Sequence, residues 1–224
     1  MGQHRLEVLP GAEAAAHRGA ELIAASAADA IAERGRFALA ASGGTEPWAM
    51  YGRLAELEVD WGRVDVFQVD ERAAPDGDPD RNLTHLTEAL PPAARERLHP
   101  MPVTDRDLER AAERYADELP EQLDLVHLGI GPDGHTASLV PGDPVLGVTD
   151  RRVAVTAGEY QGRRRMTLTY PELASAQRVL WLIAGEGKRE ALELLLAGDP
   201  SIPAGRVQAR ESIVVAERAV APAG

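Results

Sequence analysis

Short apolar runs alternate along this chain with longer segments in which apolar residues recur at helical spacing. An apolar run between turn residues is typical of a buried strand, whereas apolar positions three and four apart are typical of an amphipathic helix. Runs of the first kind occupy residues 37–41, 64–69, 125–130 and 179–183, with shorter ones at 5–9, 152–156, 166–169 and 213–215. Helical segments occupy residues 11–34, 48–57, 83–90, 105–119 and 189–196, and residues 91–103 form a proline-rich connection. This alternation predicts an α/β fold with a mostly parallel sheet and helices on both of its faces.

Composition narrows the class of protein. With 224 residues, 44% of them hydrophobic, and no internal repeat or low-complexity linker, residues 1–224 are predicted to form a single domain. The net charge of −12 argues against nucleic acid as a partner, and the lack of cysteine excludes disulfides, thiolate nucleophiles and cysteine-bound metals. There is no apolar signal core and no membrane-spanning apolar run, so we expect a cytoplasmic protein with no membrane partner. The sequence leaves open whether it is a monomer or a small homo-oligomer.

Residues 123–142, LDLVHLGIGPDGHTASLVPG, join a predicted buried strand to the most distinctive polar motif of the chain. Glycines at positions 129, 131 and 134 allow a tight turn or a close approach to a ligand. Asp133 and His135 follow the end of the strand, where open α/β sheets bind their ligands. An imidazole has an ordinary pKa of about 6.5 and can take a proton near neutral pH, so this pair suits acid–base catalysis.

The same glycines allow two other interpretations. They match the G-x-G-x-x-G pattern of dinucleotide-binding folds. Asp133, however, would place a negative charge at the pyrophosphate, and no acid stands where one should bind the ribose about 20 residues later. A structural turn followed by a helix cap would explain the glycines and Thr136, but it does not explain why Asp133 and His135 occur together.

A second glycine-rich turn, Ser42-Gly43-Gly44-Thr45, joins a predicted strand to a predicted helix. Backbone N–H groups and the helix dipole favour an anion such as phosphate at a turn of this kind. It lacks the pattern of an NTP-binding loop and that of a nucleophile elbow. A plain strand-to-helix turn is the alternative.

Four predicted strands are followed by polar or glycine-rich segments, at residues 42–45, 70–72, 131–135 and 185–188. The carboxyl ends of parallel strands meet at one edge of a sheet, so these segments are expected to form one site. The last of them ends in Lys188, the sole lysine among 24 basic residues, and a flexible ammonium there suits a phosphate.

The motifs SGGTEP, QVDER, GIGPDGHTASLVPG, RMTLT and GEGK resemble those of the 6-phosphogluconolactonase family, in the family's order and over about residues 10–215. This family is a branch of the glucosamine-6-phosphate deaminase-like group. The related deaminases share G-x-G-x-D-G-H but continue toward Ala-Phe-Asn-Glu-Pro. The resemblance implies a three-layer, doubly wound α/β fold without a required metal or cofactor. It also implies hydrolysis of 6-phospho-D-glucono-1,5-lactone to 6-phospho-D-gluconate, the second step of the oxidative pentose phosphate pathway.

The resemblance also implies roles for individual residues. His135 corresponds to the histidine that activates water as a general base, and Asp133 is expected to orient or tune it. Substrate and phosphate binding are implied for residues of the other segments, with Arg165 of RMTLT as a further candidate: Ser42, Gly43, Gly44, Thr45, Asp70, Arg72 and Lys188.

Two positions depart from the family pattern: Arg81-Asn82 stands where the family often has Ser-Asn, and Val140 replaces a common Phe. The oxyanion donor stays open between an arginine and the N–H groups of the central glycine loop. Three other functions stay open as well: a sugar-phosphate deaminase or isomerase, a catalytically silent sugar-phosphate-binding module, and a dinucleotide oxidoreductase.

Overall fold

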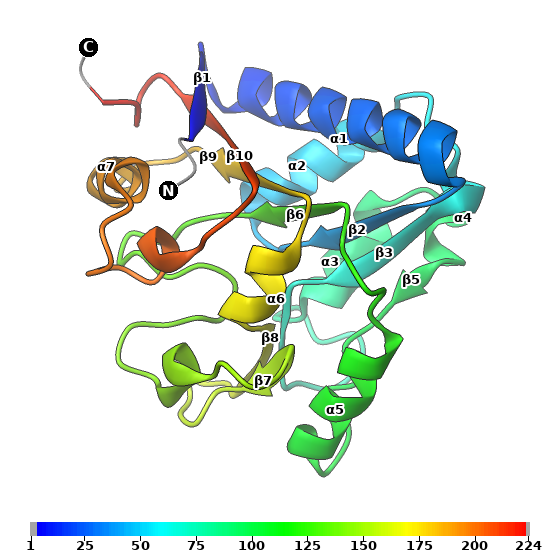
Figure 1. The fold of residues 1–224 in the computed structure, drawn as a ribbon, viewed down its shortest axis with the longest axis vertical. Helices are drawn as coiled ribbons and strands as arrows, with labels where there is room; N and C mark the ends of the chain where they lie inside the picture. Colours follow the sequence, from blue (N-terminus) through cyan, green and yellow to red (C-terminus); the bar gives the residue numbers. More distant parts are fainter. Residues whose placement is uncertain (1–3, 223–224) are drawn as a thin grey trace.

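The computed structural model describes residues 4–222 and contains, within them, a parallel seven-stranded sheet (Figure 1). The strand order is β1-β10-β9-β6-β2-β3-β5. The strands are β1 (Arg5–Leu9), β2 (Phe37–Ala41), β3 (Val64–Gln68), β5 (Leu98–His99), β6 (Leu125–Leu128), β9 (Arg178–Ile183) and β10 (Glu211–Glu217). The predicted mostly parallel α/β sheet is confirmed.

Helices cover both faces of this sheet (Figure 1). One face packs against α1 (Ala12–Arg34), α2 (Thr45–Ala55), α3 (Asn82–Ala89) and the short α4 (Pro92–Arg95). The other face packs against α5 (Leu108–Glu118), α6 (Tyr170–Ser175) and α7 (Arg189–Ala197). Side chains of each strand alternate between the two cores: in β9, Val179 and Trp181 face one core and Leu180 faces the other. Burial on both faces explains why the strands are continuous apolar runs in the sequence.

The predicted connection at residues 91–103 contains two elements that the sequence pattern did not reveal, α4 and β5. The strand β5 has two residues and α4 has four. Elements this short cannot show a period of two or of 3.6 residues, which is also why α6, with six residues, was not predicted.

A second, antiparallel sheet has the order β4-β8-β7 and consists of β4 (Asp70–Arg72), β8 (Arg165–Leu168) and β7 (Val153–Val155). Val69 links the two sheets: its N–H donates to the carbonyl of Ala41 at 3.0 Å, and its carbonyl accepts the N–H of Leu168 at 2.8 Å. The charged residues 70–72 therefore form a strand, and the register places Arg72 directly opposite Arg165.

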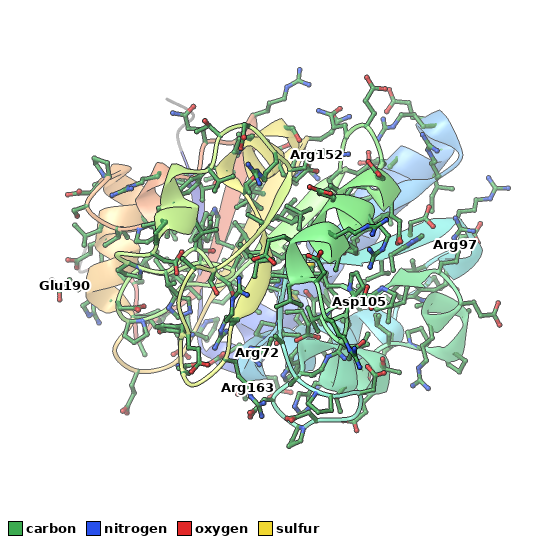
Figure 2. All side chains as sticks on the ribbon, turned by 90° about the horizontal axis from the view of Figure 1, so that it is seen from below. Arg72, Arg97, Asp105, Arg152, Arg163 and Glu190 are labelled. Atoms are coloured by element: carbon green, nitrogen blue, oxygen red, sulfur yellow. The ribbon has the colours of Figure 1, made fainter. Side chains whose placement is uncertain are left out.

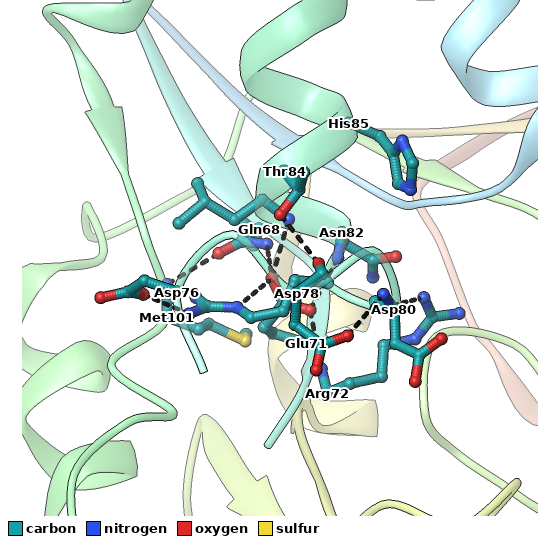
Figure 3. Close-up of polar contacts among 12 residues, drawn as sticks. Gln68, Glu71, Arg72, Asp76, Asp78, Asp80, Asn82, Thr84, His85 and Met101 are labelled. Carbon is teal, nitrogen blue, oxygen red and sulfur yellow. Dashed lines mark hydrogen bonds and ion pairs between the residues drawn. The ribbon is translucent and has the colours of Figure 1, made fainter. Parts of the chain in front are cut away.

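The carboxylate of Glu71 is fully buried and holds β4 against the start of α3 (Figure 3). Its Oε1 accepts the backbone N–H groups of Arg72 and Asn82 at 2.7 and 2.8 Å. Its Oε2 accepts the N–H of Leu83 at 2.8 Å and the side-chain amide of Gln68 at 2.9 Å. Two of these donors, the N–H groups of Asn82 and Leu83, lie in the first turn of α3 and have no acceptor within the helix. A negative charge is favourable at this end of a helix.

Arg81 completes this buried cluster. Only 2% of its side chain is exposed; its Nε lies 3.3 Å from Oε2 of Glu71, and its Nη1 lies 2.5 Å from Oδ1 of Asp76. The arginine that departs from the family pattern thus contacts an internal carboxylate. The next residue, Asn82, instead reaches the candidate site described below.

We expect Glu71→Ala to lower the free energy of unfolding by about 3–5 kcal/mol, because it removes a buried carboxylate that pairs with Arg81 and leaves four hydrogen-bond donors without their acceptor. Asp60→Ala is the matched control, since Asp60 and Arg63 form an exposed ion pair whose removal should cost less than about 1 kcal/mol. Urea denaturation of the two variants measures both values. Equal losses would contradict a stabilising role for the Glu71 cluster.

Candidate active site

A pocket of about 260 Å³ opens at the carboxyl ends of the parallel strands. Strands β2 and β6 are neighbours there, but the chain continues from β2 to β3 on one side and from β6 to β9 on the other. Open α/β sheets bind ligands at such switch points. Two larger cavities, of about 590 and 620 Å³, lie elsewhere, near the amino ends of β10 and β3. We identify the smaller pocket as the candidate site because it brings together residues of all four predicted segments: Ser42, Gly43, Gly44, Asp70, Arg72, Gly131, His135 and Lys188.

Two of the predicted site residues do not line this pocket themselves. Thr45 is exposed on the first turn of α2. Asp133 is hydrogen-bonded to His135, which does line the pocket. Arg165, predicted from RMTLT, does line the pocket, from β8. The structure adds four polar lining residues that the sequence analysis did not single out as site residues: Glu46, Asn82, Thr136 and Gln161.

Asp133 and His135 form a hydrogen-bonded pair, with 2.6 Å between Oδ1 and Nδ1. Burial disfavours the charged carboxylate, but hydrogen bonds from His135 and Tyr160 outweigh it and lower the pKa of Asp133. The ionised carboxylate can only accept, so Nδ1 of His135 carries the proton that is donated. No residue in the described range 4–222 hydrogen-bonds Nε2, so the lone pair of that nitrogen is available to a ligand.

Glycine is required at two positions of the loop that carries this pair. A Cβ at position 131 would overlap the His135 ring and lie 2.7 Å from Oδ1 of Asp133. Gly134 has a φ of 78°, and a Cβ there would lie 2.5 Å from Cβ of Ile202. Gly131 therefore lets the backbone pass close to the acid and the imidazole, and Gly134 lets the loop pack against Ile202.

The N–H groups of this loop are mostly used within it. Gly131 donates to the carbonyl of His135 at 2.9 Å, and Gly134 donates to the carbonyl of Gly131 at 3.0 Å. The N–H of His135 donates to Oδ1 of Asp133 at 3.2 Å. These three groups are not free to stabilise an oxyanion, which favours the arginine alternative.

The turn after β2 presents unpaired polar groups to the pocket. Gly44 caps α2, and the first N–H groups of a helix have no acceptor within it. Ser42 Oγ and Asn82 Oδ1 are buried and have no hydrogen-bond partner in the described part of the chain. A Cβ on Gly43 would overlap the Asn82 side chain, so this glycine is needed for α3 to approach the turn. Buried polar atoms without partners are uncommon, and a bound ligand would satisfy them.

A buried tyrosine, itself in contact with a buried histidine, forms a hydrogen bond with the backbone of this turn. The Tyr51 hydroxyl donates to the carbonyl of Ser42 at 3.2 Å and lies 2.8 Å from Nδ1 of His127. Burial lowers the pKa of His127 to about 3, so its imidazole is neutral. His127 therefore belongs to the support of the turn, even though it lies on the same central strand that leads to His135.

Three cationic side chains line the pocket. Nζ of Lys188 lies 3.7 Å from Oε2 of Glu46, and Arg72 stands opposite Arg165 across two antiparallel strands. Burial lowers the pKa of Arg165, the nearby Asp70 carboxylate opposes this effect, and Arg72 adds to it. Like charges directly opposite each other are unfavourable unless an anion lies between them.

The three arginines at residues 163–165 have different surroundings. Arg163 pairs with Asp78 and Asp80 at 3.1 and 3.3 Å. It lies close to Arg72, whose guanidinium donates a hydrogen bond to the backbone carbonyl of Asp80 (Figure 2). Arg164 pairs with an exposed glutamate of α5. Only the third arginine of the run reaches the pocket.

Comparison with known proteins identifies the family. A family model described as glucosamine-6-phosphate isomerases/6-phosphogluconolactonase matches residues 10–216. The chain belongs to this family. It is 37% identical over 203 residues to a 6-phosphogluconolactonase of Synechocystis sp., covering 83% of each chain. It is 36% identical over 225 residues to one of Streptomyces coelicolor, covering 87% of this chain and 86% of that one.

Solved structures of this family share the fold. The crystal structure of 6-phosphogluconolactonase from Thermotoga maritima has a TM-score of 0.86 and 29% identity, and covers 96% of this chain and 99% of that one. A monomeric glucosamine-6-phosphate deaminase has a TM-score of 0.82 at 22% identity, covering 96% and 98% of the two chains. The predicted family and the doubly wound α/β fold are confirmed, and the fold alone does not separate the two activities.

Within residues 4–222, no helix is long and apolar enough to cross a membrane. The same range contains no group of three or more His, Cys, Asp or Glu side chains placed to hold a metal ion.

We expect Gly131→Ala to break the hydrogen bond between Asp133 and His135, because the added methyl group occupies the position of the imidazole. The ¹⁵N shifts of the His135 ring, which report whether Nδ1 carries the proton, should change. Gly129→Ala is the matched control, since its methyl group meets no atom within 4 Å. Ring shifts that stay the same in both variants would show that the close approach at position 131 is not required.

Proposed function

We propose that this protein hydrolyses 6-phospho-D-glucono-1,5-lactone to 6-phospho-D-gluconate, with water activated by His135. The observation that carries the proposal is the Asp133–His135 pair, which directs a free imidazole nitrogen into a pocket lined by Arg72, Arg165 and Lys188. The identity with relatives named 6-phosphogluconolactonase supports the choice of substrate.

In the proposed reaction, Nε2 of His135 takes a proton from water as the water oxygen attacks C1 of the lactone. The carbonyl oxygen becomes an oxyanion, and the ionised Asp133 stabilises the imidazolium that forms. The bond between C1 and the ring oxygen then breaks, and the imidazolium returns the proton to that oxygen. The products are a carboxylic acid and a free hydroxyl group, so no further reactant is needed.

We assign the oxyanion contact to Arg165. Its Nε and Nη2 are held by the carbonyl of Tyr160, and Nη2 also by the side chain of Gln161. No residue in the described part of the chain hydrogen-bonds its Nη1. An arginine fixed in this way is preorganised to stabilise developing charge, which is how such donors accelerate acyl transfer.

We assign the phosphate to the turn at residues 42–45, together with Lys188 and Arg72. The turn offers the N–H groups of a helix start, and the buried Nε of Arg72 has no hydrogen-bond partner in the described residues. The phosphate is remote from C1, so its binding energy can position the ring for attack. Asp70 is placed among the substrate contacts, where it accepts hydrogen bonds from Ser138 and Asn82.

The segment after His135 favours hydrolysis over deamination. A deaminase must open the sugar ring and move a proton between C1 and C2, and the related enzymes carry an Asn-Glu-Pro acid for this purpose. Here Ala137 and Pro141 match the first and last residues of Ala-Phe-Asn-Glu-Pro, so the positions of Asn-Glu are occupied by Leu139 and Val140, two buried apolar residues that cannot act as an acid. Hydrolysis requires only an activated water and a stabilised oxyanion.

We expect rapid acid release from fresh 6-phosphogluconolactone, above the spontaneous rate and unaffected by a chelator, and no ammonia from glucosamine 6-phosphate. His135→Ala should remove about 10²–10⁴-fold of the acceleration and leave the fold intact, because it deletes the general base. Ammonia release at a rate comparable to lactone hydrolysis would reverse the assignment. A fully active His135→Ala variant would leave lactone hydrolysis possible but overturn this mechanism.

We expect Lys188→Ala to raise KM for the phosphorylated lactone by about 10- to 150-fold with a smaller effect on kcat, because a charge-assisted contact to the phosphate is lost. Glu46→Gln should act in the opposite direction, since it frees the ammonium from the carboxylate 3.7 Å away. Steady-state kinetics of both variants check this pair of shifts. Unchanged kinetics in Lys188→Ala would refute the phosphate role.

A further inference from the structure

A tight hairpin between β7 and β8 carries a tyrosine to the acid–base pair. Tyr160 and Arg163 exchange backbone hydrogen bonds of 3.0 and 3.4 Å across this turn. Gln161 and Gly162 between them have φ values of 53° and 77°. Two successive left-handed residues are typical of the turn that reverses a two-residue hairpin. The turn therefore fixes the direction in which Tyr160 leaves the backbone.

The Tyr160 side chain contacts both members of the pair. Its hydroxyl donates to Oδ2 of Asp133 at 3.1 Å and lies 3.3 Å from Nδ1 of His135. The two rings meet at 60° with their centres 5.2 Å apart. Because His135 occupies Oδ1 and Tyr160 occupies Oδ2, each oxygen of the carboxylate is held by a separate donor. The carboxylate cannot turn without losing one of them.

The same tyrosine holds the arginine on the other side of the hairpin. Its carbonyl accepts Nε and Nη2 of Arg165 at 3.3 and 3.2 Å, and the guanidinium carbon lies 5.1 Å from the centre of its ring. Tyr160 thus joins the proposed general base and the proposed oxyanion donor in one set of contacts. A cation over an aromatic face is favourable in itself.

We propose that Tyr160 is a positioning residue, which fixes Asp133 and through it the orientation and proton affinity of His135. The effect of Tyr160 on the reaction rate rests on the proposed lactone hydrolysis, whereas its effect on the orientation and proton affinity of the His135 ring does not. Burial and the neighbouring Asp133 charge raise the pKa of Tyr160, so the hydroxyl stays protonated and remains a donor.

The direction of the expected change in the proton affinity of His135 follows from the negative charge on Asp133. A hydrogen bond from Tyr160 withdraws negative charge from Asp133, so the carboxylate attracts the imidazolium less strongly than it would alone. Removing the hydroxyl should therefore make His135 hold its proton to a higher pH. The other charged groups that line the same pocket are unchanged by this substitution: Asp70, Arg72, Arg165, Lys188 and Glu46.

The test uses Tyr160→Phe, which keeps the ring and deletes only the hydroxyl. Tyr170→Phe is the matched control, because it removes a hydroxyl that donates to the carbonyl of Pro203 at 2.9 Å and touches neither Asp133 nor His135. Two properties are measured in each protein: the NMR titration of the His135 ring, and kcat and KM with the phosphorylated lactone. The His135 signals are assigned among the six histidines by comparison with His135→Ala.

For Tyr160→Phe we expect the His135 titration and the acid limb of kcat/KM to move together to higher pH. We expect kcat to fall about tenfold, as for a lost hydrogen bond to a charged group, with KM unchanged. In Tyr170→Phe neither property should move. A His135 titration that is the same in Tyr160→Phe as in the unsubstituted protein would overturn the positioning role. An unsubstituted protein that does not hydrolyse the lactone would overturn the proposed function, and the titration would still decide the role of Tyr160.

Discussion

The candidate site depends on one hydrogen bond, from Nδ1 of His135 to the ionised carboxylate of Asp133. This bond fixes which ring nitrogen carries the proton and leaves the other nitrogen to face the pocket. It can form only because position 131 lacks a side chain and because Gly134 turns the loop against Ile202. Tyr160 holds the second oxygen of the same carboxylate, so the charge that orients the imidazole is itself oriented.

A second buried carboxylate, Glu71, performs a structural task nearby. It ties the start of α3 to β4, and this brings Asn82 beside Gly43 and keeps Arg72 opposite Arg165. The chain thus uses adjacent acids of one short strand differently: Asp70 lines the pocket, whereas Glu71 faces Gln68 and the helix start. Both are buried, and burial alone does not tell a structural carboxylate from a ligand-binding one.

Much of this arrangement could be predicted from the sequence. The long buried strands are continuous apolar runs, and a parallel sheet brings their carboxyl ends together, which is why segments up to about residue 188 could be assigned to one site. Tyr160, Gln161 and the burial of Arg81 could not be predicted. They follow from contacts between distant segments: Tyr160 reaches back 27 residues to Asp133, and its position depends on a turn with no strong sequence signal. Arg81 is buried because it pairs with the buried carboxylate of Glu71. A buried ion pair of this kind produces no periodic pattern of apolar residues in the sequence.

The central claim is that His135, oriented by Asp133, is the base that activates water. The most direct test compares the pH dependence of kcat/KM for 6-phosphogluconolactone with the NMR titration of the His135 ring in the same protein. General-base catalysis predicts that kcat/KM falls at low pH with a midpoint equal to that of the His135 titration. A kcat/KM that stays constant while His135 takes up its proton would contradict the account.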